Sequence, residues 1–163
     1  MLKPSPIPRK SLKLARIKQI SVGKVGIRPK TGRKRRKKGE TAKLKHQLWQ
    51  LCRQIIIKRY GNICYTCKAS NLVGANLHTG HFVTSSLCSI ALRYSLDNLR
   101  PQCYRCNIHL SGNWIAFERN LQHDGIDTEE LKRRNEETKG KTYGNDWLKD
   151  KIMVYTQIAL QEQ

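Results

Sequence analysis

Apolar residues recur at helical spacing along residues 44–60, LKHQLWQLCRQIIIKRY. Side chains three, four and seven positions apart share one face of an α-helix, so this spacing predicts a helix with one buried face. The residues on that face are Leu48, Cys52, Ile55, Ile56 and Tyr60. The Gly-Asn pair at 61–62 predicts where the helix ends.

A second helical pattern runs from about Cys106 to Gln122, with apolar positions at Ile108, Ile115 and Leu121. The segment from 44 to 60, this segment and the C-terminal region each contain one tryptophan. Because large aromatic side chains in helices usually pack inward, we expect all three in the core. They are Trp49, Trp114 and Trp147.

Two more helices are predicted near the C-terminus. Asp127 stands three residues before Glu130, which is typical of a capped helix start, and Gly140 marks the end of that helix. A last helix opens at Asn145 and continues through Ile158.

The remaining chain between about 61 and 102 is rich in Gly, Ser and Asn, which predicts loops and short strands. With 163 residues and 38% hydrophobic content, the chain can bury one modest core. We therefore expect an α+β protein with a tail at 1–43, a core with its leading helix at 44–125, and C-terminal helices at 126–163 that pack on the core.

Positive charge is concentrated at the N-terminus. Residues 1–46 contain 17 Lys and Arg against one acid, Glu40, out of a net charge of +20 for the whole chain. Self-repulsion should keep this tail extended and disordered until a polyanion neutralises it, so we expect it to bind nucleic acid. A solubilising or targeting role is the alternative. The densest run is Arg33, Lys34, Arg35, Arg36, Lys37 and Lys38.

No stretch approaches the roughly 20 consecutive apolar residues that cross a bilayer, and the first residues lack the apolar segment of a signal peptide. We therefore expect a cytoplasmic protein that is not secreted and has no membrane partner. A reducing compartment also makes disulfides the less favoured use of the cysteines.

Four of the six cysteines form two C-x-x-C pairs, Cys64 with Cys67 and Cys103 with Cys106. A turn of that spacing aims two thiolates at one tetrahedral ion, so the pairs predict a structural zinc site with four cysteine ligands. Disulfides and a redox C-x-x-C are the alternatives. The other two cysteines, Cys52 and Cys88, are interpreted as small buried or partly exposed hydrophobic residues.

The distance between the two pairs is unusual, because 35 residues separate Cys67 from Cys103, against roughly 15 to 20 in a simple zinc ribbon. The intervening chain predicts an inserted hairpin that carries His78 and His81. Hydrolysis of a phosphodiester needs a base and a divalent cation, and histidine and asparagine suit these two roles. Asn107, directly after the second pair, would be held near His81.

These motifs together resemble a known family. The order C-x-x-C, G-H-F, D-N-L and C-x-x-C-N resembles the HNH, or ββα-metal, endonuclease motif on a treble-clef zinc scaffold. More narrowly, LWQLCRQIIIKRYGNICYTC, HTGHF, RYSLDNLRPQCYRCNIHLSGN and FERNLQHDG resemble the bacteriophage NinG/Rap recombination proteins over residues 44–135. The resemblance implies metal-dependent cleavage of branched DNA, such as Holliday junctions and displacement loops.

Carried over by position, the resemblance implies that His81 is the general base, that Asn107 holds Mg²⁺ or Mn²⁺, and that Asn98 braces the loop carrying the base. Many HNH enzymes have an aspartate as a second metal ligand immediately before the base, where this chain has Gly80. His78 or water would fill that place.

We therefore expect an HNH-type endonuclease acting on branched DNA, with structural Zn²⁺ and a catalytic divalent cation. Because the basic residues form no base-reading pattern, recognition by shape and backbone is expected. The alternatives are a non-catalytic zinc-stabilised DNA- or RNA-binding protein and a ribosome-associated zinc protein. The sequence leaves a homodimer open.

Overall fold

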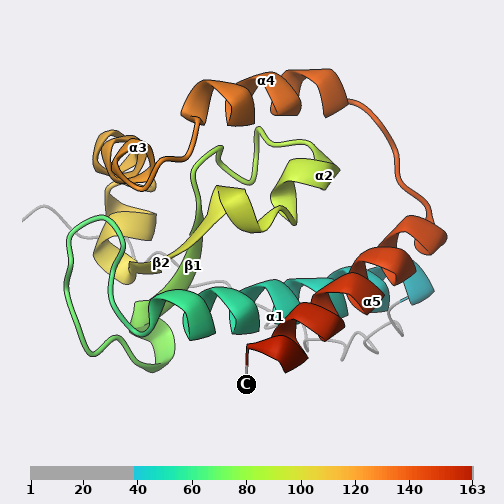
Figure 1. Cartoon of the computed structure of the whole chain (residues 1–163), viewed down its shortest axis with the longest axis horizontal. Coiled ribbons are helices and arrows are strands. Elements are labelled where there is room, and N and C mark those ends of the chain that lie inside the picture. The colour runs from blue at the N-terminus through green and yellow to red at the C-terminus, as the bar shows by residue number, and fades with distance from the viewer. Residues whose placement is uncertain (1–38, 163) are drawn as a thin grey trace, which may run out of the picture. The chain divides into compact units, whose positions relative to one another are not determined.

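The computed structural model describes residues 39–162, and its elements form a mixed α+β arrangement, as predicted (Figure 1). The helices are α1 (Glu40–Tyr60), α2 (Ile90–Arg93), α3 (Trp114–His123), α4 (Thr128–Thr138) and α5 (Asn145–Gln161). The strands are β1 (Leu77–His81) and β2 (Leu99–Cys103). Single turns are η1 (Gly74–Asn76), η2 (Leu96–Asn98) and the π-helix η3 (Arg105–His109). The basic run at 33–38 lies outside the described residues.

The two strands pair antiparallel, with Leu77 opposite Cys103 at one end and His81 opposite Leu99 at the other. This register sets the end of β2 that carries Cys103 beside the start of β1. The strands are joined by residues 82–98, which include α2 and η2, rather than by a tight hairpin turn. His81 therefore stands at the point where β1 passes into a long connection.

Helix α1 packs along α5, and both contribute to one hydrophobic cluster (Figure 1). The predicted apolar face of α1 is confirmed, because Leu48, Cys52, Ile55 and Ile56 have no exposed surface. From β2 and the chain before it, Leu99 and Tyr94 complete the cluster. Burying large aliphatic side chains stabilises each by roughly 1.5–3 kcal/mol, which is enough to dock α1 against the sheet.

A second cluster includes residues of α3 and α4, two helices that lie on the side of the strands away from α5 (Figure 1). It contains Tyr65, Phe82, Phe117, Leu121 and Leu131. The connection at 82–98 is therefore packed on one side against the cluster of α3 and α4 and on the other side against the cluster of α1 and α5.

The start of α4 is as predicted. Asp127 is the N-cap, and its side chain accepts the backbone N–H of Glu130 at 3.0 Å. This contact satisfies one of the amide groups that the first turn of a helix leaves without a partner. Helix α5 begins at Asn145, also as predicted.

The continuous helix predicted from Cys106 to Gln122 is wrong. The chain forms η3, turns, and then restarts as α3, because Ser111, Gly112 and Asn113 all have positive φ, at 48°, 92° and 48°. Three successive left-handed residues cannot continue a right-handed helix. Of the three predicted apolar positions, Leu121 is fully buried as predicted, whereas Ile108 and Ile115 are 49% and 67% exposed.

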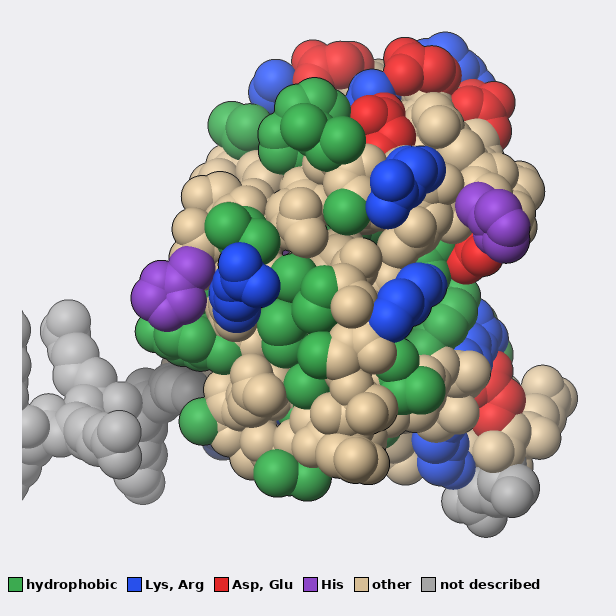
Figure 2. Space-filling model, turned by 90° about the vertical axis from the view of Figure 1, so that its left-hand side faces the viewer, with side chains coloured by type: hydrophobic (Ala, Val, Ile, Leu, Met, Phe, Trp, Pro, Cys, Tyr) green, Lys and Arg blue, Asp and Glu red, His purple; other side chains and the backbone are tan. Residues whose placement is uncertain are grey.

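The prediction that Trp114 lies in the core is wrong for the same reason, because the restarted helix leaves it 57% exposed. Hydrophobic side chains reach the surface on this side of the molecule (Figure 2). Within residues 39–162, no helix is long and apolar enough to span a membrane.

Candidate metal and catalytic site

The four paired cysteines come together from three elements. Cys64 and Cys67 lie in the turn after α1, Cys103 ends β2, and Cys106 lies in η3. Their sulfur atoms all lie within 4.8 Å of one another. The four thiols could hold a metal ion such as zinc.

The distances and the donor set fit that ion. Zn–S bonds of about 2.3 Å arranged as a tetrahedron place the sulfur atoms about 3.8 Å apart, and Cys67 Sγ lies 3.8 Å from Cys103 Sγ. The backbone N–H of Cys106 donates to Cys103 Sγ at 3.4 Å, and Asn113 Nδ2 donates to Cys106 Sγ at 3.5 Å. Donors of this kind stabilise thiolates.

The pKa values of the clustered thiols shift in opposite directions, down at Cys64 and up at Cys67 and Cys103. Burial raises the pKa of Cys64, but hydrogen bonds from Thr66 and from nearby backbone groups outweigh it and lower that pKa to about 6. Burial raises the pKa of Cys67 and of Cys103 instead. Because zinc binds thiolates, metal binding at this cluster would release protons from the thiols whose pKa is raised.

His81, the last residue of β1, is held by two contacts. Its Nε2 lies 3.1 Å from the backbone carbonyl oxygen of Arg93, and its ring stacks on Trp49 at 5.3 Å between centroids and 5° between planes. A carbonyl oxygen can only accept, so Nε2 carries the proton and Nδ1 keeps its lone pair. Nδ1 makes no hydrogen bond within residues 39–162.

The imidazole of His81 is neutral at physiological pH. Burial against the neighbouring residues lowers its pKa from 6.5 to about 4. The hydrogen bond to the Arg93 carbonyl opposes this shift, and the positive charge of Arg93 adds to it. Trp49, which was expected only as a core residue, lies partly buried on top of this ring.

His78 and Asn107 face one another. Asn107 Nδ2 lies 3.1 Å from His78 Nδ1, and His78 Nε2 lies 2.9 Å from the carbonyl oxygen of Ala75. The second contact assigns the proton of His78 to Nε2, so its Nδ1 presents a lone pair toward the Asn107 amide. The two side chains thus satisfy one another in this structure, and a cation held by both His78 Nδ1 and the Asn107 amide oxygen would replace this hydrogen bond.

Gly80 has no room for a side chain. A Cβ at this position would lie 1.9 Å from Gln102 Oε1 and 3.1 Å from Asn107 Oδ1. Gln102 is fully buried and is held in place because its Nε2 donates to the carbonyl oxygen of Gly112 at 2.7 Å. An aspartate before the histidine would have to displace the buried side chain of Gln102, and His78 is the side chain that contacts Asn107.

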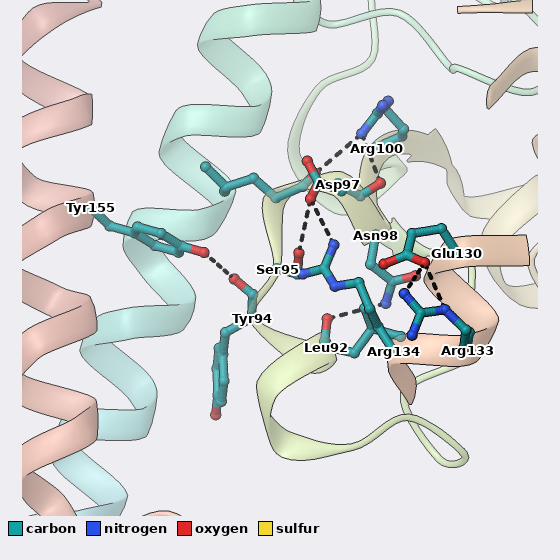
Figure 3. Close-up of polar contacts among 11 residues, drawn as sticks. Leu92, Tyr94, Ser95, Asp97, Asn98, Arg100, Glu130, Arg133, Arg134 and Tyr155 are labelled. Carbon is teal, nitrogen blue, oxygen red and sulfur yellow. Dashed lines mark hydrogen bonds and ion pairs between the residues drawn. The ribbon is translucent and has the colours of Figure 1, made fainter. Parts of the chain in front are cut away.

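Asn98 lies beneath the site rather than in it. It has no exposed surface, and its Oδ1 accepts the backbone N–H of Val83 at 2.8 Å. Its Nδ2 donates to the carbonyl oxygen of Val83 at 3.2 Å and to that of Leu92 at 3.3 Å, and the contact with Leu92 is drawn in Figure 3. Asn98 therefore ties the chain just after His81 to α2, and it makes no contact with the cleft.

Three hollows surround His81. The largest, about 630 Å³, is lined by Trp49, Arg53, His78, His81 and Asn107, among others, and we call it the main cleft. A second hollow of about 290 Å³ contains Trp49, His81, Ser85, Arg93 and Tyr94. A third, also about 290 Å³, includes His81, Asn107 and Ser111.

Sequence reasoning did not select three of the residues around His81. Trp49 and Arg53 come from α1, where their four-residue spacing is a weak signal that they share a face. Arg93 has no sequence signal, because it reaches His81 only through the course of the chain after β1. The residues of the basic run at 33–38 lie outside the described part of the chain.

Comparison with known families gives one match. The family model described as Bacteriophage Lambda NinG protein matches residues 10–161. The matched segment contains the four cysteines and every residue of the main cleft. Comparisons with curated proteins and with solved structures each gave no match.

Proposed function

Since the chain belongs to the bacteriophage lambda NinG family, and since a neutral histidine lines a cleft beside an imidazole and amide pair, we propose that it is a metal-dependent DNA endonuclease. The proposed substrate is branched DNA of the kind formed in recombination, including four-way junctions. The proposed fold of the site is the ββα-metal, or HNH, motif on a treble-clef zinc scaffold, formed by β1, β2, η3 and the four cysteines.

The observation that carries the proposal is the state of His81. Its Nε2 is fixed on the Arg93 carbonyl oxygen, its pKa is lowered to about 4, and its ring lines the main cleft. A general base must be unprotonated and must present its lone pair to water. In the proposed reaction, Nδ1 of His81 accepts the proton of a water molecule as the water oxygen attacks phosphorus. One P–O ester bond of the phosphodiester breaks, and the leaving oxygen takes up a proton from solvent.

Asn107 and His78 would hold the divalent cation, Mg²⁺ or Mn²⁺, in this site. When bound, such an ion polarises the phosphate and stabilises the charge on the leaving oxygen. The donor set of one nitrogen and one oxygen suits Mn²⁺ better than Mg²⁺, because Mg²⁺ prefers oxygen ligands throughout. Mn²⁺ is therefore expected to support cleavage at the lower concentration.

The surrounding residues orient the base. Trp49 and the Arg93 carbonyl fix the plane and the tautomer of the His81 ring, and Asn98 fixes the backbone directly after it. A base held in one orientation loses little entropy when the substrate arrives. The zinc site would act from below, by holding η3 and hence Asn107 against β1.

The test compares the wild type with His81→Ala on labelled four-way junction, linear duplex and single strand, each with and without Mg²⁺ or Mn²⁺. We expect metal-dependent cleavage of the junction that falls by about 10²- to 10⁴-fold in the variant, the usual loss of a general base. His123→Ala is the matched control, because this exposed histidine lies at the end of α3, outside all three hollows.

Two outcomes contradict the proposal. Undiminished cleavage by His81→Ala would remove His81 as the base. Junction binding by the wild type without cleavage in either metal would instead indicate the non-catalytic DNA-binding alternative.

A further inference from the structure

Two arginines stand on either side of the stacked pair formed by Trp49 and His81. Arg53 lines the main cleft, and Arg93 lines the second hollow. Trp49, His81 and Ser85 line both, so the two hollows adjoin across the proposed base. A strand that crosses His81 would pass one arginine and then the other.

Arg53 reaches the cleft from α1. It follows Trp49 by four residues, which places both side chains on the same side of the helix. It is partly buried and makes no ion pair within the described residues. By contrast, Arg59, six residues further along α1, pairs with Glu162 at 2.6 Å.

Arg93 is held at the other side. Its guanidinium donates to the backbone carbonyl of Ser85, while its own carbonyl oxygen accepts from His81. Its side chain is exposed and has no acidic partner within the described residues. The residue that fixes the base thus also presents a free positive charge beside it.

Neither hollow contains an acidic side chain. All 12 Asp and Glu of the chain lie between 40 and 162, so they belong to the described residues. Acidic side chains gather instead over α4, at the top of the face seen in Figure 2. A concave wall with two unpaired guanidinium groups and no carboxylate complements a chain of phosphates, which arginine binds through two parallel hydrogen bonds.

We propose that Arg53 and Arg93 bind two backbone phosphates of one DNA strand, on opposite sides of the phosphodiester that faces His81. This inference rests on the proposed function, because it takes DNA as the ligand of the cleft. It adds the path of the strand over the surface, which runs between the second hollow and the main cleft and crosses Trp49 and His81. It also makes α1 a substrate-binding element.

The experiment measures binding rather than cleavage. The full-length His81→Ala chain, zinc retained and no Mg²⁺ or Mn²⁺ added, is titrated with a four-way junction over a range of salt concentrations. Adding Arg53→Ala or Arg93→Ala should weaken binding by about tenfold, as expected for loss of one charge-assisted contact. Each should also lower the slope of log affinity against log salt by about 1.

Arg59→Ala in the same background is the matched control, because it removes one positive charge from the same helix outside the hollows. Its salt slope should equal that of the parent. Arg53→Lys keeps the charge without the planar fork, so its salt slope should stay close to that of the parent while its affinity falls. Thermal unfolding is measured for every variant to check that the fold is retained.

A second measurement identifies the phosphates. Single neutral methylphosphonates are placed along the bound strand, one per junction. A methylphosphonate at one position should weaken binding of the parent but not of Arg53→Ala. A methylphosphonate at a different position on the same strand should weaken binding of the parent but not of Arg93→Ala. Such a loss of coupling is the signature of a direct contact.

The proposal is overturned if neither arginine variant binds more weakly than Arg59→Ala, or if every methylphosphonate affects the parent and both variants equally. If the wild type binds the junction with these arginine effects yet never cuts it, the nuclease proposal fails while the phosphate path stands. The two failures are therefore distinguishable.

Discussion

At the scale of single residues, the burial that lowers the pKa of His81 includes its stacking contact with Trp49. The indole stacks on the imidazole and keeps water from one face of it. Burial then lowers the pKa of His81 to about 4, because the charged form is poorly solvated. A histidine in water would instead be partly protonated near neutral pH.

Trp49→Ala should therefore raise the pKa of His81 from about 4 toward its ordinary value of 6.5. NMR titration of the His81 ring protons measures this directly in the wild type and the variant. The acidic limb of the cleavage rate should move upward in pH by a similar amount, since the base works only when unprotonated. Titration of wild-type His81 near 6.5 would contradict the expectation.

The same shift affects stability. The folded-state pKa lies below that of the unfolded chain, so the unfolded state takes up the proton first as the pH falls from about 6.5 toward 4. The contribution of His81 to stability is therefore complete above pH 6.5 and is lost as the pH falls through this window.

At the scale of elements, helices with a buried face were predictable and the turn at 111–113 was not. Apolar spacing predicts α1 because four residues of its face are fully buried, and the Asp127 cap predicts α4. The turn depends on polar contacts: Gln102 binds the carbonyl oxygen of Gly112, and Asn113 binds Cys106 Sγ. Apolar periodicity contains no information about such contacts.

The candidate site divides in the same way. The four cysteines could be predicted because metal ligands leave a spacing in the sequence. The contact between His81 and Trp49 could not, because it requires α1 to dock on the sheet. Docking is decided by the packing of α1 against α5 and β2. These elements lie far from α1 in the sequence, and α5 begins only at Asn145.

The buried side chain of Gln102 leaves no room for a Cβ at Gly80, and Gly80→Ala should destabilise the protein by roughly 1–3 kcal/mol, the usual cost of overpacking. The new Cβ would lie 1.9 Å from Gln102 Oε1 and would push Gln102 off the Gly112 carbonyl. Urea unfolding measures the change in the free energy of unfolding.

Gly144→Ala is the control for this prediction, because nothing lies within 4 Å of a Cβ at Gly144 and its φ is −75°. If both alanine variants unfold at the same urea concentration, the close approach at Gly80 has no energetic consequence. Gly80→Asp should also fail to supply a metal ligand, since a longer side chain meets the same obstacle.

At the scale of the whole molecule, the described chain has three hydrophobic clusters of unequal strength. The clusters under α1 and α5 and under α3 and α4 contain large aliphatic and aromatic side chains. The third consists of Cys64, Cys103 and Cys106 with Leu72, and Leu77 packs against it. So little apolar surface provides few kcal/mol by burial alone, and a metal ion held by the four cysteines would add to the stability of this part of the fold.

Removal of zinc should therefore unfold the region around β1, β2 and η3 before the α1 and α5 pair. Structural zinc contributes on the order of 10 kcal/mol in small modules. Hydrogen exchange after stoichiometric chelation should show fast exchange at the amides of both strands, while amides of α1 and α5 facing their shared cluster remain slower. Asn107 follows Cys106 directly, so any metal-dependent cleavage should be lost with the same zinc stoichiometry.

Cys67→Ser and Cys88→Ser separate zinc ligation from the general effect of losing a thiol. Cys67 Sγ belongs to the cluster of four, whereas Cys88 packs partly buried against the cluster under α3 and α4. Cys67→Ser should lower the zinc content and the thermal midpoint, and Cys88→Ser should leave the zinc content at one ion per chain. Strand amides that stay protected after complete zinc removal would show that the third cluster is stable without a metal, and Asn107 would then owe its position to Gln102 and the turn at 111–113.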